Sequence, residues 1–230
     1  MILWLDQRRT QVIRPQNPLL LAGASLIGAG TLIREAGQVG YTNYLIDCEP
    51  EIWKKADKFV LLSGYLHRWL LGFFCDSLSN QAGHIPFDSK RQKWADWRDV
   101  KYHVYPVEPE KRVPLVPSGT VMGNLSAAAQ ADTGLSAKVQ VIAAAPDKAC
   151  ETLGTGCADD TEAVLSFGSQ ATVQTISRKY YELQQFVPSF PAATPGCWSP
   201  ELQVYRGYWM IQWFLKEMEN AGVQEQEHPE

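Results

Sequence analysis

The residue whose type and position best suit chemistry is Asp147. It follows the apolar run Val139–Ala145, which has the length and composition of a buried strand, and precedes a helix expected over Lys148–Leu153, with Gly154 ending it. Proteins of the α/β class place ligands where such strands end. Free N–H groups at a helix start favour an ionised carboxylate there, which could accept a proton. The alternative is that Asp147 only caps the helix, and the spacing alone favours that structural role.

A second candidate is the segment around Gly168. The runs Ala163–Phe167 and Ala171–Ile176 are β-like, and they predict a tight hairpin with Gly168 at the turn. Glycine lets an anion approach the backbone, and the hydroxyls of Ser169 and Thr172 could donate hydrogen bonds to it. The alternative, an ordinary β-turn, is favoured when this segment is considered alone.

A third candidate lies near the start of the sequence. Met1–Asp6 is a strand-like apolar run, and the polar side chains of Asp6, Arg8 and Arg9 come at its end. They could hold the hydroxyls of a small polar substrate, while Trp4 offers an apolar face to a sugar ring. The alternative is a solvated strand end.

The composition limits the classes of protein to which the chain can belong. Of its 230 residues, 45% are hydrophobic, which excludes a disordered chain. A net charge of −4 gives no basic footprint for nucleic acid, and no cluster of Lys and Arg suggests a membrane surface. The uncharged stretch Pro15–Ile33 contains two prolines and is short for a membrane span, so we expect a buried helix or an apolar loop.

Cysteine and histidine usage favours a reducing, cytoplasmic location and no structural metal site. The five cysteines are scattered and show no paired spacing, and the four histidines do not cluster. Asp6, Arg8 and Arg9 interrupt the apolar start, so no signal peptide is expected.

The remaining pattern predicts mostly helices before residue 75 and mixed structure after it. Leu19–Gly37 is expected to be mostly helical, Pro50 to open a short helix, and Lys58–Leu71 to form a longer one. Cys75–Pro117 is turn-rich and is interpreted as an irregular surface or ligand-facing region. A short helix capped by Ser126 should stop at Gly134. A last helix is expected over Gln203–Met218, with one apolar face: Val204, Tyr208, Ile211 and Leu215.

Taken in order, these segments resemble the FGGY family of carbohydrate kinases. The matching stretches begin with Trp4–Arg8, similar to the family's W-x-D-x-R strand, and continue through Cys48–Gly72, Asp76-Ser77, Pro86–Asp88 and Val116–Leu135. They end with Val139–Cys157, similar to the stretch with the family's catalytic aspartate, Ser166–Val173, similar to its phosphate hairpin, and Tyr205–Phe214.

The resemblance implies an α/β, actin-like ATPase fold of the ribonuclease-H type, incomplete and comprising parts of two domains. Residues 1–158 would be the later part of the sugar-binding domain, and residues 159–230 the start of the nucleotide-binding domain. The implied reaction is ATP-dependent phosphorylation of a sugar or polyol, with Asp147 as general base and Mg²⁺ bridging the phosphates. Trp4, Asp6, Arg8 and Lys148 would bind the sugar or polyol, and Gly168, Ser169 and Thr172 would meet the nucleotide phosphates.

The sequence also departs from the family pattern. A D-x-G-T phosphate loop should precede the W-x-D-x-R strand, a glycine-rich adenosine segment should follow the hairpin region, and neither is found in the sequence. We therefore expect missing segments to be needed for activity, and the alternative is a non-catalytic relative that binds a sugar or a partner. An interrupted sheet would also expose apolar surface, so a homodimer or poor solubility is expected.

Overall fold

The computed structural model describes residues 6–11, 18–168, 170–184, 187–204 and 207–222. The helices within these ranges are α1 (Pro18–Leu26), α2 (Gly30–Val39), α3 (Tyr41–Cys48), α4 (Pro50–Lys55), α5 (Leu62–Leu71), α6 (Val100–Val104), α7 (Ala127–Thr133), α8 (Asp147–Gly154) and α9 (Tyr208–Asn220). The strands are β1 (Asp76–Ser77), β2 (Phe87–Asp88), β3 (Lys93–Trp94), β4 (Leu115–Val116), β5 (Val121–Asn124), β6 (Gln140–Ile142), β7 (Val164–Phe167), β8 (Ala171–Gln174), β9 (Phe190–Pro191), β10 (Trp198–Ser199) and β11 (Glu201–Val204). Short 3₁₀ turns, η1 and η2, cover Leu78–Asn80 and Pro109–Lys111.

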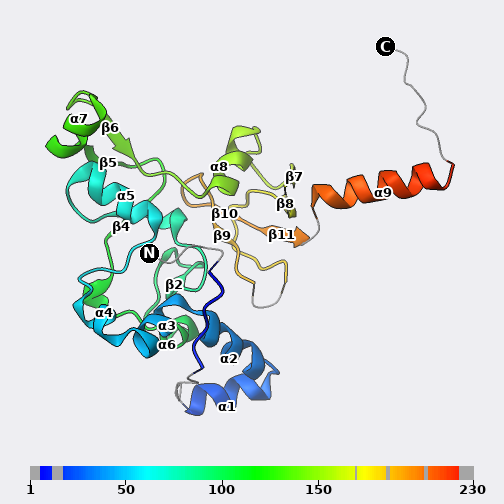
Figure 1. Ribbon diagram of the computed structural model, residues 1–230, viewed down its shortest axis with the longest axis horizontal. Coiled ribbons are helices and arrows are strands. Elements are labelled where there is room, and N and C mark those ends of the chain that lie inside the picture. Colours follow the sequence, from blue (N-terminus) through cyan, green and yellow to red (C-terminus); the bar gives the residue numbers. More distant parts are fainter. Residues whose placement is uncertain (1–5, 12–17, 169, 185–186, 205–206, 223–230) are drawn as a thin grey trace.

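The helices α1 to α4 lie together in one part of the molecule (Figure 1). The expected helical stretch Leu19–Gly37 is two helices, because Gly28 has φ 75° and its left-handed backbone separates α1 from α2. Pro50 opens α4 as predicted, since its missing N–H has no helical partner to lose at that position. Within the described residues, no helix combines the length and apolar character needed to cross a membrane.

Helix α5 begins later than predicted, at Leu62 instead of Lys58, and ends where expected, at Leu71. Gly64 lies on the face of α5 that approaches β1. A Cβ on Gly64 would lie 3.3 Å from Asp76 Oδ2, so the glycine permits this close contact. Strands β1 and β4 pair in parallel beside the helix.

The region Cys75–Pro117 is turn-rich as predicted, but its interpretation as surface is wrong. Ile85, Phe87 and Val113 are each no more than 3% exposed and belong to the buried core. Phe87 packs edge to face on Trp94, whose indole N–H donates to the carbonyl of Val113 at 2.8 Å. Turn residues interrupt the hydrophobic periodicity here without placing the apolar side chains in solvent.

Helix α7 has the predicted ends. Ser126 Oγ accepts a hydrogen bond from Ala129 N at 3.1 Å, and Gly134, with φ 72°, closes the helix. The strand expected over Val139–Ala145 is shorter and not buried. β6 pairs antiparallel with β5 in a two-stranded sheet, and Ile142 is 52% exposed. The apolar composition predicts burial, but within this run Ala143 is buried while Ile142 is largely exposed.

The predicted hairpin is present and belongs to a three-stranded antiparallel sheet. β8 is central, flanked by β7 and β11, and α8 lies beside this sheet (Figure 1). The helix predicted over Gln203–Met218 is wrong at its start, because residues up to Val204 form β11. None of the described side chains of α9 is buried, and the helix projects from the body (Figure 1).

A small core joins this sheet to the segment that follows it. Cys157, Ile176, Ala192 and Cys197 form a buried cluster, against which Val164 of β7 packs. All five cysteines of the sequence are free.

Candidate functional site

Asp147 is the first residue of α8 and is exposed. Its Oδ1 accepts a hydrogen bond from the backbone N–H of Lys148 at 2.7 Å, which satisfies one of the free donors of the first turn. The prediction that Asp147 caps a helix beginning at Lys148 is wrong, because α8 begins at Asp147 itself and Pro146 occupies the capping position without a side-chain cap. Because the side chain is open to solvent, the second carboxylate oxygen can still meet an incoming hydroxyl.

Helix α8 is fastened to the sheet by two polar contacts one helical turn apart. Near its start, Lys148 Nζ donates to Ser166 Oγ on β7 at 3.0 Å. Further along, Thr152 and Gln174 of β8 share a buried hydrogen bond of 2.6 Å. These contacts bring the predicted base and the predicted phosphate hairpin into one unit.

Gly168 lies at the turn between β7 and β8, as predicted. Its N–H donates to Gln170 O at 3.1 Å, and its carbonyl accepts from Tyr208 N at 2.9 Å. The φ of Gly168 is not left-handed, and a Cβ would meet only Gln170 O at 3.6 Å. The fold therefore does not require glycine at this position. A glycine here could serve instead to let an anion approach the backbone.

Thr172 is buried on β8, directly opposite Ser166 in the sheet register. Its Oγ1 has no hydrogen-bond partner within the part of the chain that the structure describes. A buried hydroxyl in this state costs free energy unless something outside the described residues pairs with it. It lies on the side of the sheet that α8 contacts, because Gln174, two residues along, bonds to Thr152.

Asp6 and Arg8 form an ion pair with each other near the start of the chain. Arg8 Nη2 lies 2.5 Å from Asp6 Oδ2, and the guanidinium stacks 5.0 Å from the centre of the Tyr44 ring on α3. Hydrogen bonds from Arg8 hold the pKa of Asp6 at about 2, and the pKa of Arg8 is raised by the same pairing. Both groups are thus charged at neutral pH and could bind hydroxyls.

Two of the predicted site residues, Trp4 and Ser169, lie outside the described residues. The strand expected over Met1–Asp6 also falls mostly outside them.

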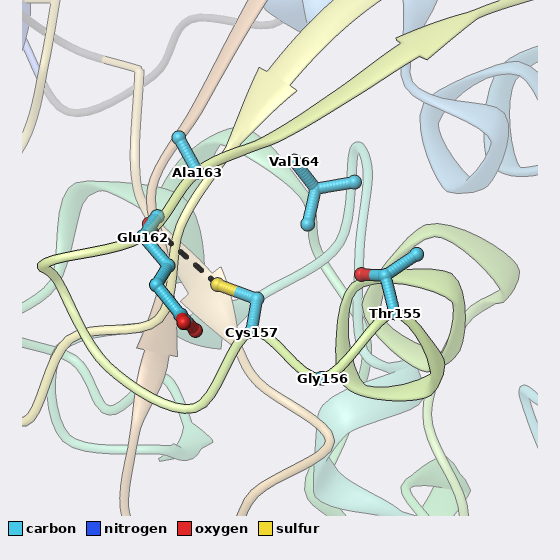
Figure 2. A pocket seen from close by; sticks show the side chains of 6 residues that line it. All are labelled: Thr155, Gly156, Cys157, Glu162, Ala163 and Val164. Atoms are coloured by element: carbon cyan, nitrogen blue, oxygen red, sulfur yellow. Dashed lines mark hydrogen bonds between the residues drawn. The ribbon is translucent and has the colours of Figure 1, made fainter.

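An open hollow of about 530 Å³ lies at the other end of α8 from Asp147. It is lined by Thr155, Gly156, Cys157, Glu162, Ala163 and Val164 (Figure 2). The Cys157 thiol donates a hydrogen bond to Glu162 O at 3.6 Å (Figure 2). None of the predicted site residues lines this hollow.

Sequence reasoning missed the polar cluster around Asp76, which is 1% exposed. Its carboxylate accepts hydrogen bonds from Ser63 at 2.8 Å and Gln81 at 2.9 Å, and His67 Nδ1 lies 3.2 Å from it. Burial alone would raise the pKa of Asp76, but the surrounding donors, His67 foremost, hold it below its ordinary value. Asp76 joins α5 to β1, and in the sequence it was marked only by the similarity of Asp76-Ser77 to the family pattern.

The fit of the described residues to Mg²⁺ and ATP depends on which of them could hold a metal ion or a phosphate group. In the described ranges, no group of three or more His, Cys, Asp or Glu side chains could hold a metal ion. The Lys148 ammonium and the unpaired Thr172 hydroxyl are groups that suit phosphate oxygens. These two groups could therefore hold the phosphate oxygens of a nucleotide.

Comparison with known proteins identifies the family. The family model described as "FGGY family of carbohydrate kinases, N-terminal domain" matches residues 1–154. A xylulose kinase of Staphylococcus epidermidis is 31% identical over 130 residues, which are 56% of this chain and 25% of that protein. The "Uncharacterized sugar kinase YgcE" of Escherichia coli is 29% identical over 164 residues, or 68% of this chain and 32% of that protein.

Solved structures show the same fold. A gluconate kinase from Lactobacillus acidophilus superposes with a TM-score of 0.67 at 16% identity, over 85% of this chain and 41% of that structure. The chain thus has part of the actin-like ATPase fold, and it spans about a quarter to a third of the length of the curated relatives it matches. With the family model matching 1–154, the chain belongs to the FGGY family of carbohydrate kinases.

Proposed function

We propose that this chain carries the base and part of the phosphate site of an ATP-dependent kinase that phosphorylates a sugar or polyol hydroxyl. The observation that carries the proposal is the attachment of α8, with Asp147 exposed at its start, to the hairpin strand through Lys148 and Ser166. A base and a phosphate site on adjacent, mutually fastened elements suit a reaction in which catalysis is mostly positioning.

In the proposed reaction, Asp147 accepts the proton of the substrate hydroxyl. The hydroxyl oxygen then forms a bond to the γ-phosphorus of ATP as the bond from that phosphorus to the bridging oxygen breaks, releasing ADP. Trp4, Asp6, Arg8 and Lys148 are proposed to bind the sugar. Gly168, Ser169 and Thr172 are proposed to meet the phosphates, and Mg²⁺ supplies charge neutralisation when it is bound with ATP.

The substrate class is proposed from the relatives. Among them are proteins named xylulose kinase and gluconate kinase, so D-xylulose and gluconate are the first compounds to test. We also propose that residues 1–158 belong to the sugar-binding domain and residues 159–230 to the nucleotide-binding domain.

The experiment is a sugar-dependent ADP-release assay on the chain joined to the phosphate-loop and adenosine segments of its family, with and without Asp147→Asn. We expect Asp147→Asn to abolish turnover and to leave sugar affinity, measured by calorimetry, largely unchanged. Asp160→Asn, at another exposed aspartate, is the matched control and should retain wild-type turnover. An unchanged turnover number in Asp147→Asn would remove this residue from the mechanism.

The second candidate is a non-catalytic relative that binds a sugar or a partner. Calorimetry separates the two: sugar binding without ADP release, together with very weak Mg-ATP binding, would support the second candidate over catalysis by this chain alone.

A further inference from the structure

Lys148 makes one contact on each side of the junction between α8 and β7. Its Nζ donates to Glu151 Oε2 on its own helix at 2.8 Å and to Ser166 Oγ on β7 at 3.0 Å. Asp147 immediately precedes Lys148, and Gly168 follows Ser166 by two residues. The contact thus spans the short distance between the proposed base and the proposed phosphate turn.

Because β7 and β8 pair in the sheet, the contact of Lys148 with Ser166 affects both strands of the hairpin. Ser166 pairs with Thr172 in the register of β7 and β8, so a side chain that fixes Ser166 also fixes the strand opposite. The other attachment of α8, from Thr152 to Gln174, lies one turn further from Asp147. Lys148 is therefore the attachment nearest to the proposed base.

The two contacts of Lys148 differ in burial. Its ion pair within α8 is open to solvent, with side chains 38% exposed for Lys148 and 50% for Glu151, and such pairs contribute little to the free energy of unfolding. Its contact with Ser166 is part-buried and joins α8 to β7. A displacement of about 1 Å near reacting groups costs on the order of 100-fold in rate, so a contact that sets the relative position of these two elements can matter for catalysis.

We propose that Lys148 is a positioning residue that holds the hairpin around Gly168 at a fixed distance from Asp147. The inference rests on the proposed kinase function and adds to it a residue that acts through Ser166. Removing either partner loosens the hairpin against the start of α8, while the contact between Thr152 and Gln174 keeps the two elements together.

Steady-state kinetics provide the first test, with Lys148→Met, Ser166→Ala, the double variant and the conservative Lys148→Arg. Each single loss should lower kcat/KM for ATP by about tenfold or more, and Ser166→Ala should leave KM for the sugar within about twofold. The double variant should be no worse than either single variant, because both remove the same contact. Lys148→Arg should retain most of the activity, and Lys138→Met, at an exposed lysine elsewhere, all of it.

Two kinetic results would overturn the proposal. One is a raised KM for the sugar in Lys148→Met with no effect of Ser166→Ala, which would mean that Lys148 acts on the sugar alone. The other is full additivity of the two substitutions.

Amide hydrogen exchange of the whole chain tests the proposal without turnover. Exchange in β7 and β8 should be faster in Lys148→Met and Ser166→Ala and unchanged in Lys148→Arg and Lys138→Met. Unaltered exchange in Lys148→Met would refute the positioning role. Absence of sugar-dependent ADP release when the chain is joined to the phosphate-loop and adenosine segments of its family would instead refute the proposed function, so the two failures are distinguishable.

Discussion

The hydroxyl of Ser79 donates a hydrogen bond of 2.8 Å to the backbone carbonyl of Ala192, and both residues are buried. Ser118 Oγ lies 2.6 Å from Ser79 Oγ and shares the interaction. Ser79 belongs to the part of the chain matched by the N-terminal-domain family model, and Ala192 lies beyond it. The indole N–H of Trp198 likewise donates to Ser89 O at 2.7 Å. The later segment is thus attached to the earlier one by buried polar contacts as well as by apolar packing.

Ser79→Ala is expected to destabilise this attachment. The substitution removes the donor at 2.8 Å and leaves Ala192 O with Ser118 Oγ at 3.4 Å, a weaker partner. An under-satisfied buried carbonyl costs about 1–3 kcal/mol, so the free energy of unfolding in urea should fall by about that amount. Ser136→Ala, at an exposed serine, is the control and should change it by less than about 0.5 kcal/mol. Equal stability of the two variants would contradict the expectation.

Asp76 should make the protein sensitive to acid. Its pKa is lower in the folded chain than its ordinary value, so its contribution to stability is present above about pH 4 and is lost as the pH falls through the folded value. Asp76→Asn should lower the free energy of unfolding at pH 7 by on the order of 3 kcal/mol. It should also flatten the loss of stability below pH 4, measured by urea unfolding across pH.

The control for Asp76 is Asp160→Asn, which changes an exposed carboxylate. It should preserve both the stability at pH 7 and the acid sensitivity of the wild type. If Asp76→Asn retained the full acid sensitivity, the buried carboxylate would not be its source.

What the sequence predicted well depends on interactions within a few residues. Ser126 and Gly134 define α7 through a side-chain cap and a left-handed turn, both of which are local. The same holds for Pro50 at the start of α4 and for the hairpin at Gly168. Such signals do not need knowledge of distant segments.

What the sequence predicted poorly depends on which segments cover one another. The run Val139–Ala145 has the composition of a buried strand, yet Ile142 is 52% exposed because little packs over β6. The contact of Lys148 with Ser166 requires α8 to lie against β7, and no spacing rule gives that arrangement. The partners of Asp76 likewise come from α5 and the turn after β1.

Thr172→Val should separate the structural and functional roles of a buried hydroxyl. Thr172 Oγ1 lacks a partner among the described residues, so its removal should leave the free energy of unfolding unchanged or raise it by up to about 1–3 kcal/mol. If the hydroxyl meets a phosphate, the same variant should bind inorganic phosphate or Mg-ATP more weakly in calorimetry.

The matched control for this prediction is Thr152→Val on α8. Thr152 Oγ1 is buried but bonded to Gln174, so its loss should destabilise the chain. A Thr172→Val variant destabilised as much as Thr152→Val would show that the Thr172 hydroxyl has a structural partner instead.

The sheet face opposite α8 should make the chain associate with a second copy of itself. Alternate side chains of β7, β8 and β11 point to this face, and all of them are apolar and between 39% and 61% exposed: Leu165, Phe167, Val173, Leu202 and Val204. A contiguous apolar patch on three strands favours association. Sedimentation velocity over a concentration series should therefore show reversible dimer formation, and Phe167→Lys with Leu202→Lys should abolish it. Gln203→Lys, on the same strand but the other face, should dimerise as the wild type does; a wild type that stays monomeric at every concentration would disprove the prediction.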